Sequence, residues 1–495
     1  MEPPPTGTSG AASRLVPLAW IGGGALALWL AFGHGFVQYD TFYGLLWGNE
    51  IAHDEAPDYD VPLSPTPHPL ATLAGVVMAP LGDGAEDVTV AIAFVSLAAV
   101  AYLTYRLGAA WFNPAVGALA AAIVITRQPL LDYGVRAYVD VPYLALLLAA
   151  LLIETRRPRA GWPVLALLAL AGLLRPEAWL FGAAYIVYLA YFADRRGPPG
   201  LSLSPLLDFA RRRPALVALA AAAPVLWVAY DLAVTGDPLY SLTGTRDTVE
   251  TLERDTGLGG LVVDGPQRLG EVLREPVLIG AAAGLILGIA LMRRRSAIAA
   301  IALLLALGAF AVLALAGLAV LTRYLLPAAT MLAIFCAAGA LGWLSLEPRD
   351  PWRRRWAILG GAVLALLVVF APAQVDRLAN LQDSIAIQDK IGDDLHELAD
   401  SGGFEQSCEP VTVPSARAVP FLALWLDRRP SDIVPAGEEA AAEPRSGYLA
   451  EPATSEVEEV FRLDPNEPVA ALPPTPKGYE MTFSNESWDL YARCP

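Results

Sequence analysis

Residues 296–320 read S-A-I-A-A-I-A-L-L-L-A-L-G-A-F-A-V-L-A-L-A-G-L-A-V, 25 positions without one charged side chain. Three arginines, Arg293–Arg295, come directly before them. A helix of about 20 apolar residues is long enough to cross the hydrocarbon core of a bilayer, and basic residues beside a span are typical of its cytoplasmic end. This stretch therefore predicts a transmembrane helix whose amino end is inside.

Similar apolar runs recur along the chain. Of its 495 residues, 55% are hydrophobic and 17% are charged, whereas soluble domains have roughly 45–50% apolar and about 25% charged residues. This composition predicts an all-α polytopic membrane protein and excludes a cytosolic enzyme, a secreted disulfide scaffold and a DNA-binding module. The hydropathy pattern predicts eleven spans, at about 15–36, 87–106, 112–130, 139–154, 161–174, 177–193, 214–233, 276–292, 296–320, 324–345 and 356–373.

The distribution of arginine predicts the orientation. Of the 25 basic residues before Val375, 17 fall in loops that eleven alternating spans place on the same side as the N-terminus, which indicates the cytoplasmic side. We therefore expect a short cytoplasmic tail at 1–14 and a membrane domain at 15–374, with outside loops at 37–87 and 231–275. The protein is expected in the cytoplasmic (plasma) membrane, with a C-terminal domain at 375–495 outside.

The C-terminal segment is acidic. It contains nine basic and 23 acidic residues, a net charge of −14 out of −16 for the whole chain, so a polyanionic partner such as nucleic acid is not expected. An amphipathic helix from Leu378 and short β-like runs such as Val411–Val413 predict a small α/β domain. Cys408 and Cys494 are the only cysteines expected outside, where an oxidising compartment would allow them to pair. The sequence leaves both a disulfide and two free thiols open.

Two carboxylates lie at predicted membrane boundaries. Asp40 follows the first span, and a carboxylate in that partly dehydrated setting is a candidate general base. No helix clearly begins at Asp40, which favours a functional role over capping. Asp140 begins the fourth span and is followed by Pro142, so it is either a helix-capping residue or a functional one.

Four arginines lie in outside loops or at the outer ends of spans, against the general trend of basic residues. A guanidinium at the membrane surface can bind a phosphate group through two hydrogen bonds. The alternative is that each arginine simply extends its charge to the interface. The candidates for phosphate binding are Arg136, Arg175, Arg246 and Arg323.

His53 and Asp54 in the first outside loop are candidate ligands for a divalent cation. The alternative to a metal site is that the acidic residues of this loop are simply exposed to solvent. No sequence motif requires a cofactor. A divalent cation is the one possible cofactor that the residues of this loop would suit.

The order and spacing of these elements resemble the GT-C polytopic glycosyltransferases, in particular the protein O-mannosyltransferases, the aminoarabinose transferases and the RgtA/B/C/D-like sugar transferases. The resemblance covers about residues 15–373. It departs from the family pattern where the commoner H-P-P-L is H-P-L and where Thr41 replaces a second acid. The matching elements are Tyr39-Asp40 after the first span, His68-Pro69-Leu70 before a short surface helix, Asp140 in R-A-Y-V-D-V-P, Arg323-Tyr324, and an outside domain after the last span.

The resemblance implies an inverting glycosyltransferase that uses a polyprenyl-phosphate sugar as donor in a membrane-lipid environment. Asp40 would deprotonate an acceptor hydroxyl on a glycan, lipid or protein. Asp140 and His68 would orient the acceptor, a metal or the first loop. Arg136, Arg175 and Arg323 would stabilise the departing phosphate.

Two other classes of protein remain open. A secondary transporter of a small solute would place ionisable residues near the bilayer midplane or show repeated halves, and the predicted spans have almost no charges at their centres. A membrane anchor that displays the C-terminal domain would need only one span. Substitution of Asp40 separates these classes, because it should abolish activity only in an enzyme.

Overall fold

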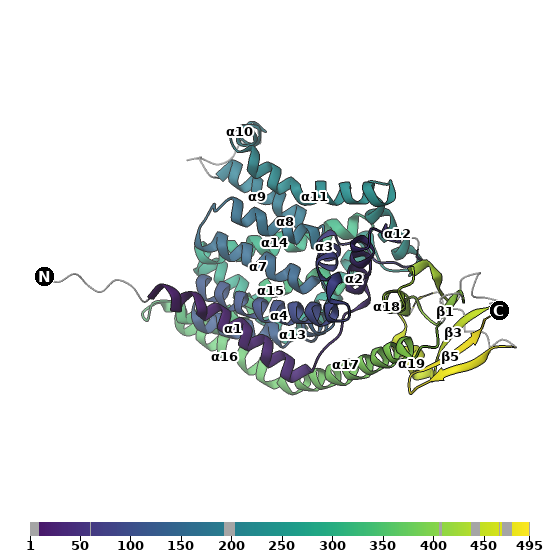
Figure 1. Cartoon of the computed structure of the whole chain (residues 1–495). Coiled ribbons are helices and arrows are strands. Elements are labelled where there is room, and N and C mark those ends of the chain that lie inside the picture. Colours follow the sequence, from purple (N-terminus) through teal and green to yellow (C-terminus); the bar gives the residue numbers. More distant parts are fainter. Residues whose placement is uncertain are drawn as a thin grey trace.

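The computed structural model describes residues 9–59, 61–192, 203–404, 408–436, 446–464, 466–467 and 478–494. Most of the predicted cytoplasmic tail at 1–14 lies outside these ranges. A body of stacked helices makes up most of the molecule, and a small sheet domain is attached at one end of it (Figure 1).

The first half of the body begins with α1, which lies along α4 (Figure 1). Asn113 begins α5 by accepting a hydrogen bond from the Val116 amide at 3.0 Å, and Pro114 occupies the first turn, where no amide donor is needed. The helices are α1 (Ser9–Phe32), α4 (Gly84–Trp111), α5 (Pro114–Ile125), α6 (Gln128–Val135), α7 (Asp140–Arg156), α8 (Trp162–Leu174), α9 (Ala178–Phe192), α10 (Ser204–Arg212) and α11 (Pro214–Thr235).

The second half is organised around α15, which is buried along almost its whole length. Glycines allow α13 to approach it closely, because a Cβ added at Gly284 would collide with the carbonyl of Phe335. α13 bends at Arg274, whose backbone is not helical. The helices are α12 (Tyr240–Thr251), α13 (Gly257–Leu291), α14 (Arg293–Leu315), the short 3-10 helix η2 (Thr322–Leu325), α15 (Leu326–Leu341), the 3-10 helix η3 (Gly342–Ser345), α16 (Pro351–Val369) and α17 (Ala371–Asp400).

Each of the eleven predicted spans overlaps a helix, but those at 112–130 and 356–373 cross the breaks between α5 and α6 and between α16 and α17, where the chain bends by 64° and 40°. Six helices in the described chain are long and apolar enough to cross a membrane, or up to eight if two bent pairs each count as one span. α8 and α9 are apolar but only 13 and 15 residues long. The structure therefore confirms an all-α polytopic body, and the count of eleven remains a prediction.

The first of the two loops predicted to lie outside, at 37–87, is mostly helical. It forms α2 (Tyr39–Ala52), α3 (Pro69–Met78) and the 3-10 helix η1 (Ala79–Leu81). α2 and α3 cross in close contact because glycines at positions 44, 48 and 75 leave no side chains between them. The expectation that no helix begins at Asp40 is wrong, since Asp40 lies in the first turn of α2. The second loop likewise forms α12 and the first part of α13.

The C-terminal domain is a mixed five-stranded sheet in the order β2-β1-β3-β5-β4. β1 is parallel to both β2 and β3, and β5 is antiparallel to β3 and β4. The elements are β1 (Val411–Val413), the 3-10 helix η4 (Ala416–Ala418), α18 (Val419–Trp425), the 3-10 helix η5 (Pro430–Asp432), β2 (Ile433–Pro435), β3 (Gly447–Pro452), α19 (Ser455–Phe461), β4 (Glu480–Ser484) and β5 (Trp488–Arg493).

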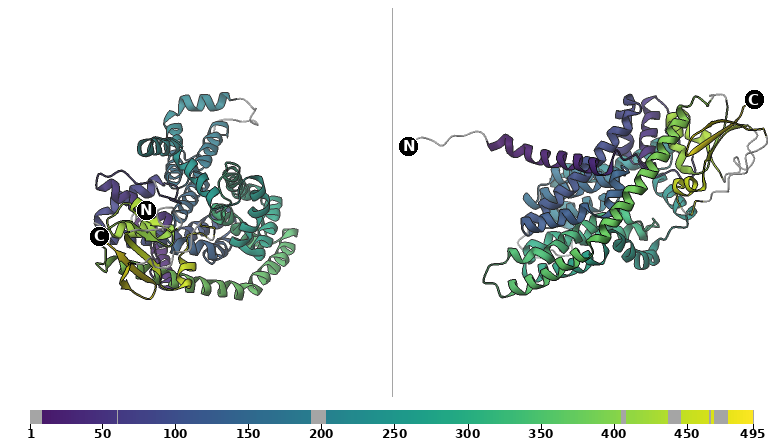
Figure 2. Two further views of the ribbon diagram at one scale, coloured as in Figure 1. Left: turned by 90° about the vertical axis from the view of Figure 1, so that its right-hand side faces the viewer. Right: turned by 90° about the horizontal axis from the view of Figure 1, so that it is seen from below.

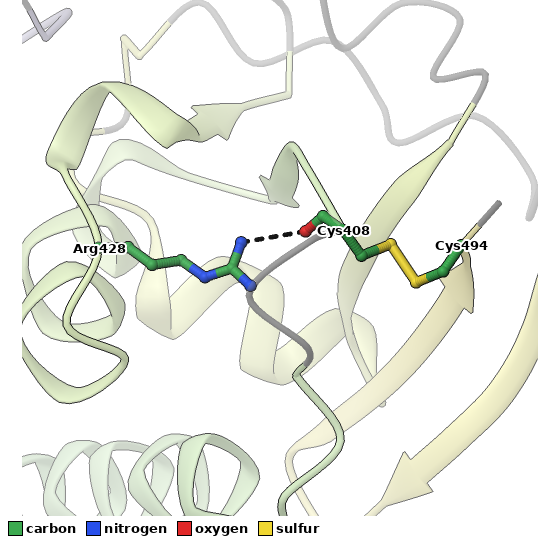
Figure 3. Close-up of a disulfide and its surroundings, with 3 residues drawn as sticks. All are labelled: Cys408, Arg428 and Cys494. Carbon is green, nitrogen blue, oxygen red and sulfur yellow. Dashed lines mark hydrogen bonds between the residues drawn. A yellow bond between two sulfur atoms is a disulfide. The ribbon is translucent and has the colours of Figure 1, made fainter.

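A disulfide between Cys408 and Cys494 joins the two ends of this domain (Figure 3). The Arg428 guanidinium donates a hydrogen bond to the Cys408 carbonyl at 3.1 Å. The bond closes 86 residues of chain. Of the two alternatives that the sequence left open, the structure contains the disulfide.

α17 runs from the helical body to the sheet domain (Figures 1 and 2). Its buried face shares one hydrophobic core with α2 and with the sheet. Tyr43 and Trp47 of α2 belong to this core together with Leu395 of α17 and Trp488 of β5. The helix that carries Asp40 is therefore held by the C-terminal domain as well as by the spans.

Candidate active site

Asp40 and Arg323 form an ion pair although they are 283 residues apart in the chain. Gln38 caps α2 by accepting a hydrogen bond from the Asp40 amide at 2.8 Å. The Asp40 carboxylate then accepts a hydrogen bond from the Arg323 guanidinium, with Nη1 and Oδ2 2.6 Å apart. The side chains are 17% and 19% exposed, respectively, so a ligand can still reach both.

Asp40 is held in its ionised form. Burial favours the neutral carboxyl and alone would raise its pKa, but the charge of Arg323 and its hydrogen bond outweigh burial and lower the pKa. Arg254 acts weakly in the same direction. Asp40 is therefore a carboxylate at neutral pH and accepts rather than donates a proton.

A second arginine lies in a buried carboxylate pair. One Arg175 nitrogen is 3.0 Å from Asp140 Oδ1 and another is 3.0 Å from Glu177 Oε1. The three side chains are at most 6% exposed. Asp140 is the first residue of α7, and the N-cap of that helix, Val139, makes no side-chain capping bond. The sequence left helix capping and a functional role open for Asp140. The structure places the Asp140 carboxylate against Arg175.

Tyr324 connects the two ion pairs. Its ring centroid is 4.6 Å from Cζ of Arg175 and 5.8 Å from Cζ of Arg323. Both guanidinium groups thus lie within the range of a cation–π contact with one ring. The spacing of the two charged groups is consequently fixed by packing.

His68 lies beside these pairs at the start of α3. Its side chain is buried among them, and its ring packs edge-on against Trp227 with the centroids 5.9 Å apart. Burial and the positive charge of Arg175 lower the pKa of His68 to about 3, so the ring is neutral at physiological pH. Its Nδ1 has no hydrogen-bond partner among the described residues.

Three predicted site residues lie away from these ion pairs, and a fourth, Arg136, lies near Asp40, since its carbonyl accepts a hydrogen bond from the Gln38 amide at 3.0 Å. The Arg246 guanidinium donates to the Ala316 carbonyl at 2.9 and 2.6 Å from an exposed position and contacts none of the residues above. Arg136 pairs with Asp132 at 2.9 Å. His53 and Asp54 are exposed at the end of α2. In the part of the chain that the structure describes, no group of three His, Cys, Asp or Glu could hold a metal ion, so the proposed metal site has no support.

Two charged residues near the site, Arg417 and Glu177, were not selected as site residues from the sequence. Arg417 of the sheet domain lies within electrostatic range of Asp40 and Arg136 and stacks its guanidinium on Phe461, 5.6 Å from the ring centroid. No motif marks it, because it lies in another domain. Glu177 follows Arg175 closely in the chain, and this short spacing was the one sequence feature that could have indicated their ion pair.

A cleft of about 510 Å³ opens between the loop at 37–87, α12 and the sheet domain. The Tyr39 hydroxyl, next to Asp40 in the chain, donates to the carbonyl of Leu63 in its wall at 3.1 Å. One face of α12 supplies Ser241, Thr245 and Thr248. The described lining holds many hydroxyl groups and no arginine or lysine.

No family model and no curated protein matches this sequence. Among solved structures, ArnT from Cupriavidus metallidurans bound to undecaprenyl phosphate matches with a TM-score of 0.58 at 13% identity, over 97% of this chain and 98% of that chain. The chain has a GT-C fold. ArnT in the apo state matches with a TM-score of 0.55, also at 13% identity and over 97% and 98% of the two chains.

An oligosaccharyltransferase from Archaeoglobus fulgidus shows a weaker likeness, with a TM-score of 0.48 at 11% identity, over 89% of this chain and 70% of that chain. The fold shared with ArnT confirms the GT-C-like assignment that the sequence suggested. It also confirms a multi-pass membrane body that carries a small C-terminal sheet domain.

Proposed function

We propose that this protein is an inverting glycosyltransferase that moves a sugar from a polyprenyl-phosphate donor to an acceptor hydroxyl at the outer face of the membrane. The observation that carries this proposal is the ion pair of Asp40 and Arg323, which puts a base beside a group that binds phosphate. The fold is that of ArnT, a protein that binds undecaprenyl phosphate, and this likeness supports a lipid-phosphate donor.

In the proposed reaction the acceptor oxygen attacks the anomeric carbon from the side opposite the phosphate. Asp40 takes the hydroxyl proton as the new carbon–oxygen bond forms. The bond between the anomeric carbon and the phosphate oxygen breaks, and its electron pair leaves on the lipid phosphate. Arg323 stabilises the negative charge that develops on that oxygen. One displacement inverts the configuration, so no sugar is ever attached to the enzyme.

Arg323 has two anionic partners in this scheme. Without donor its guanidinium is paired with Asp40 at 2.6 Å. The phosphodiester of the donor carries one negative charge, as a carboxylate does, and its oxygens compete for the same nitrogen atoms. Binding of the donor would therefore weaken the Asp40 pair and make the carboxylate more basic. The base would be fully available only when a donor is present.

The second ion pair would position this machinery. Arg175 is paired with both Asp140 and Glu177, and its guanidinium packs on Tyr324, which also contacts Arg323. We therefore assign Arg175 and Asp140 as positioning residues, together with neutral His68. Arg136 and Arg417 lie nearby and extend the basic surface around Asp40. The orientation with the N-terminus inside would put this site on the outer side.

The test is sugar release from radiolabelled polyprenyl-phosphate sugars by purified protein in lipid. Wild type is compared with Asp40→Asn, which keeps the size of the side chain but removes the base, and with Asp83→Asn, which removes an exposed carboxylate before α4. We expect release by wild type and Asp83→Asn and a loss of about 10²–10⁴-fold in Asp40→Asn.

Equal release by wild type and Asp40→Asn would remove Asp40 from the mechanism. No release from any donor, together with passage of a hexose or an ion into proteoliposomes, would establish a transporter instead. A membrane anchor would show neither activity.

A further inference from the structure

Three arginines meet on the helical body away from the ion pairs described above. Arg127 lies between α5 and α6, where the chain bends by 64°. Its Nη1 donates to the Leu273 carbonyl at 3.2 Å, and the next residue, Arg274, is the point at which α13 bends. Gln374 of α17 donates to the Thr126 carbonyl at 2.7 Å. Arg377 is one turn further along α17, so two bends and a helix start lie together.

The positive charge of this cluster is not balanced locally. Arg127 lies within electrostatic range of both Arg274 and Arg377. Within the described ranges, none of the three arginines has a carboxylate oxygen within 4.0 Å. Glu275, the acidic residue that acts on Arg377, is exposed. Three like charges with a single exposed acid in range still repel each other, so a bound anion would stabilise this arrangement.

Arg274 itself is unusual in two respects. Its backbone has a φ of 65° and a ψ of 161°, a region that side chains other than glycine rarely adopt and that persists only where the surroundings hold it. Its buried Nε has no hydrogen-bond partner in the described structure. A buried donor without an acceptor is costly, and an oxygen of a bound anion would satisfy it.

The surroundings of the cluster are apolar. Val369 at the end of α16 is 71% exposed, Val375 at the start of α17 is 63% exposed and Ile279 on α13 is 57% exposed. The cluster lies where the spans predicted at 112–130, 276–292 and 356–373 meet the outer surface, and basic residues are not expected there. A ligand that fits has an anionic head and apolar chains.

We propose that Arg127, Arg274 and Arg377 bind the phosphate of an anionic phospholipid from the outer leaflet, whose acyl chains lie against the exposed apolar residues of α13, α16 and α17. Arg274 and Arg377 face the phosphate, and Arg127 joins it while holding the Leu273 carbonyl. The lipid ties together the bend in α13, the bend between α5 and α6, and the start of α17. It occupies different arginines from those assigned to the sugar donor.

The experiment is native mass spectrometry of the full chain in detergent, titrated with phosphatidylglycerol. Phosphatidylcholine serves as the zwitterionic lipid, and undecaprenyl phosphate and inorganic phosphate are added as competitors. Arg274→Gln and Arg377→Gln are the test variants, because Arg127 also holds a backbone carbonyl. Arg268→Gln is the control, since it removes an exposed arginine of α13 that is paired with Glu271.

We expect wild type and Arg268→Gln to bind phosphatidylglycerol and to prefer it over phosphatidylcholine. Each test variant should weaken that binding by about tenfold or more, the loss expected for one charge-assisted hydrogen bond. Unchanged binding in both variants, or equal binding of the two phospholipids, would overturn the proposal. Displacement by undecaprenyl phosphate but not by inorganic phosphate would assign the cluster to the sugar donor instead and would also overturn it.

A loss of lipid binding counts in favour of the proposal only when the variant is still folded. The elution volume on size exclusion and the intact Cys408–Cys494 disulfide show whether each variant is folded. A reverse variant, Glu275→Gln, keeps all three arginines and removes the acid that acts on Arg377. It should retain or strengthen binding of phosphatidylglycerol, and a loss would contradict the proposal.

Discussion

The substitution Arg175→Met tests whether the buried ion pairs support the site. Arg175 is paired with Asp140 and Glu177, and the three side chains are 5%, 1% and 6% exposed. Methionine has a similar length but no charge, so the substitution leaves two carboxylates buried without a cation. The matched control is Arg268→Met, because Arg268 and Glu271 are 38% and 32% exposed and 3.2 Å apart.

The expected magnitudes follow from burial. Removing one partner of a buried ion pair costs about 3–5 kcal/mol because the remaining charge cannot be solvated. Arg175 has two such partners, so we expect a loss at the upper end of that range. An exposed pair contributes about 0–1 kcal/mol, and Arg268→Met should be nearly neutral. The two substitutions delete the same groups and should differ by about 3 kcal/mol or more.

The assay is unfolding in mixed micelles, followed by resistance to a protease as the denaturing detergent is increased. A further variant combines Arg175→Met with Asp140→Asn and Glu177→Gln, which removes both uncompensated charges. It should be more stable than Arg175→Met alone, although it carries two more substitutions. Additive losses in this triple variant, or an equal loss in Arg175→Met and Arg268→Met, would refute the ion-pair reasoning.

Four further outcomes are expected. Reduction of the disulfide, or Cys494→Ser, should destabilise the sheet domain by up to about 4–5 kcal/mol for a closed loop of 86 residues, seen as faster amide exchange in β5. The pKa of His68 falls from 6.5 to about 3 on folding, so the free energy of unfolding should decrease as pH falls below about 6.5. His68→Gln should remove this part of the decrease when unfolding is measured as a function of pH. Burial raises the pKa of Glu50 from 4.5 to about 7, so its contribution has the opposite sign: stability should decrease as pH rises from about 4.5 to 7, and Glu50→Gln should abolish this slope in the same titrations. Gly284→Ala should cost about 1–3 kcal/mol in the micelle assay through its clash with α15, whereas Gly308→Ala, with nothing within 4 Å, should be neutral or slightly stabilising.

The helical body was predictable from the sequence because membrane spans are defined locally. A run such as 296–320 is apolar whatever its neighbours are, and its helix follows from the need to satisfy every backbone hydrogen bond within lipid. The start of α2 was not predictable in the same way. Its N-cap is Gln38, which is outside the usual capping set of Ser, Thr, Asp and Asn, so the boundary at Tyr39 carries a weak signal.

The site could be predicted only in part, because sequence shows residue types but not their partners. Asp40 and Arg323 were each selected separately, and the structure pairs them across 283 residues. Arg246 was selected by the same reasoning and instead binds the Ala316 carbonyl. At the level of sequence the two arginines are equivalent, since both lie at positions predicted to be at the outer side of the membrane. Only the turn of the chain at η2 brings Arg323 against α2.

The C-terminal domain belongs to the site through the helix that carries Asp40. Tyr39, one residue before Asp40, is buried in a core that also contains Leu395 of α17 and Trp488 of β5. Its hydroxyl reaches the Leu63 carbonyl in the wall of the 510 Å³ cleft. A displacement of the sheet domain would therefore move Asp40 relative to Arg323, whose position depends on α15 in the spans. Because the proposed base and the proposed phosphate-binding arginine rest on different parts of the molecule, their separation depends on the core that α2 shares with the sheet domain, a domain that the disulfide closes.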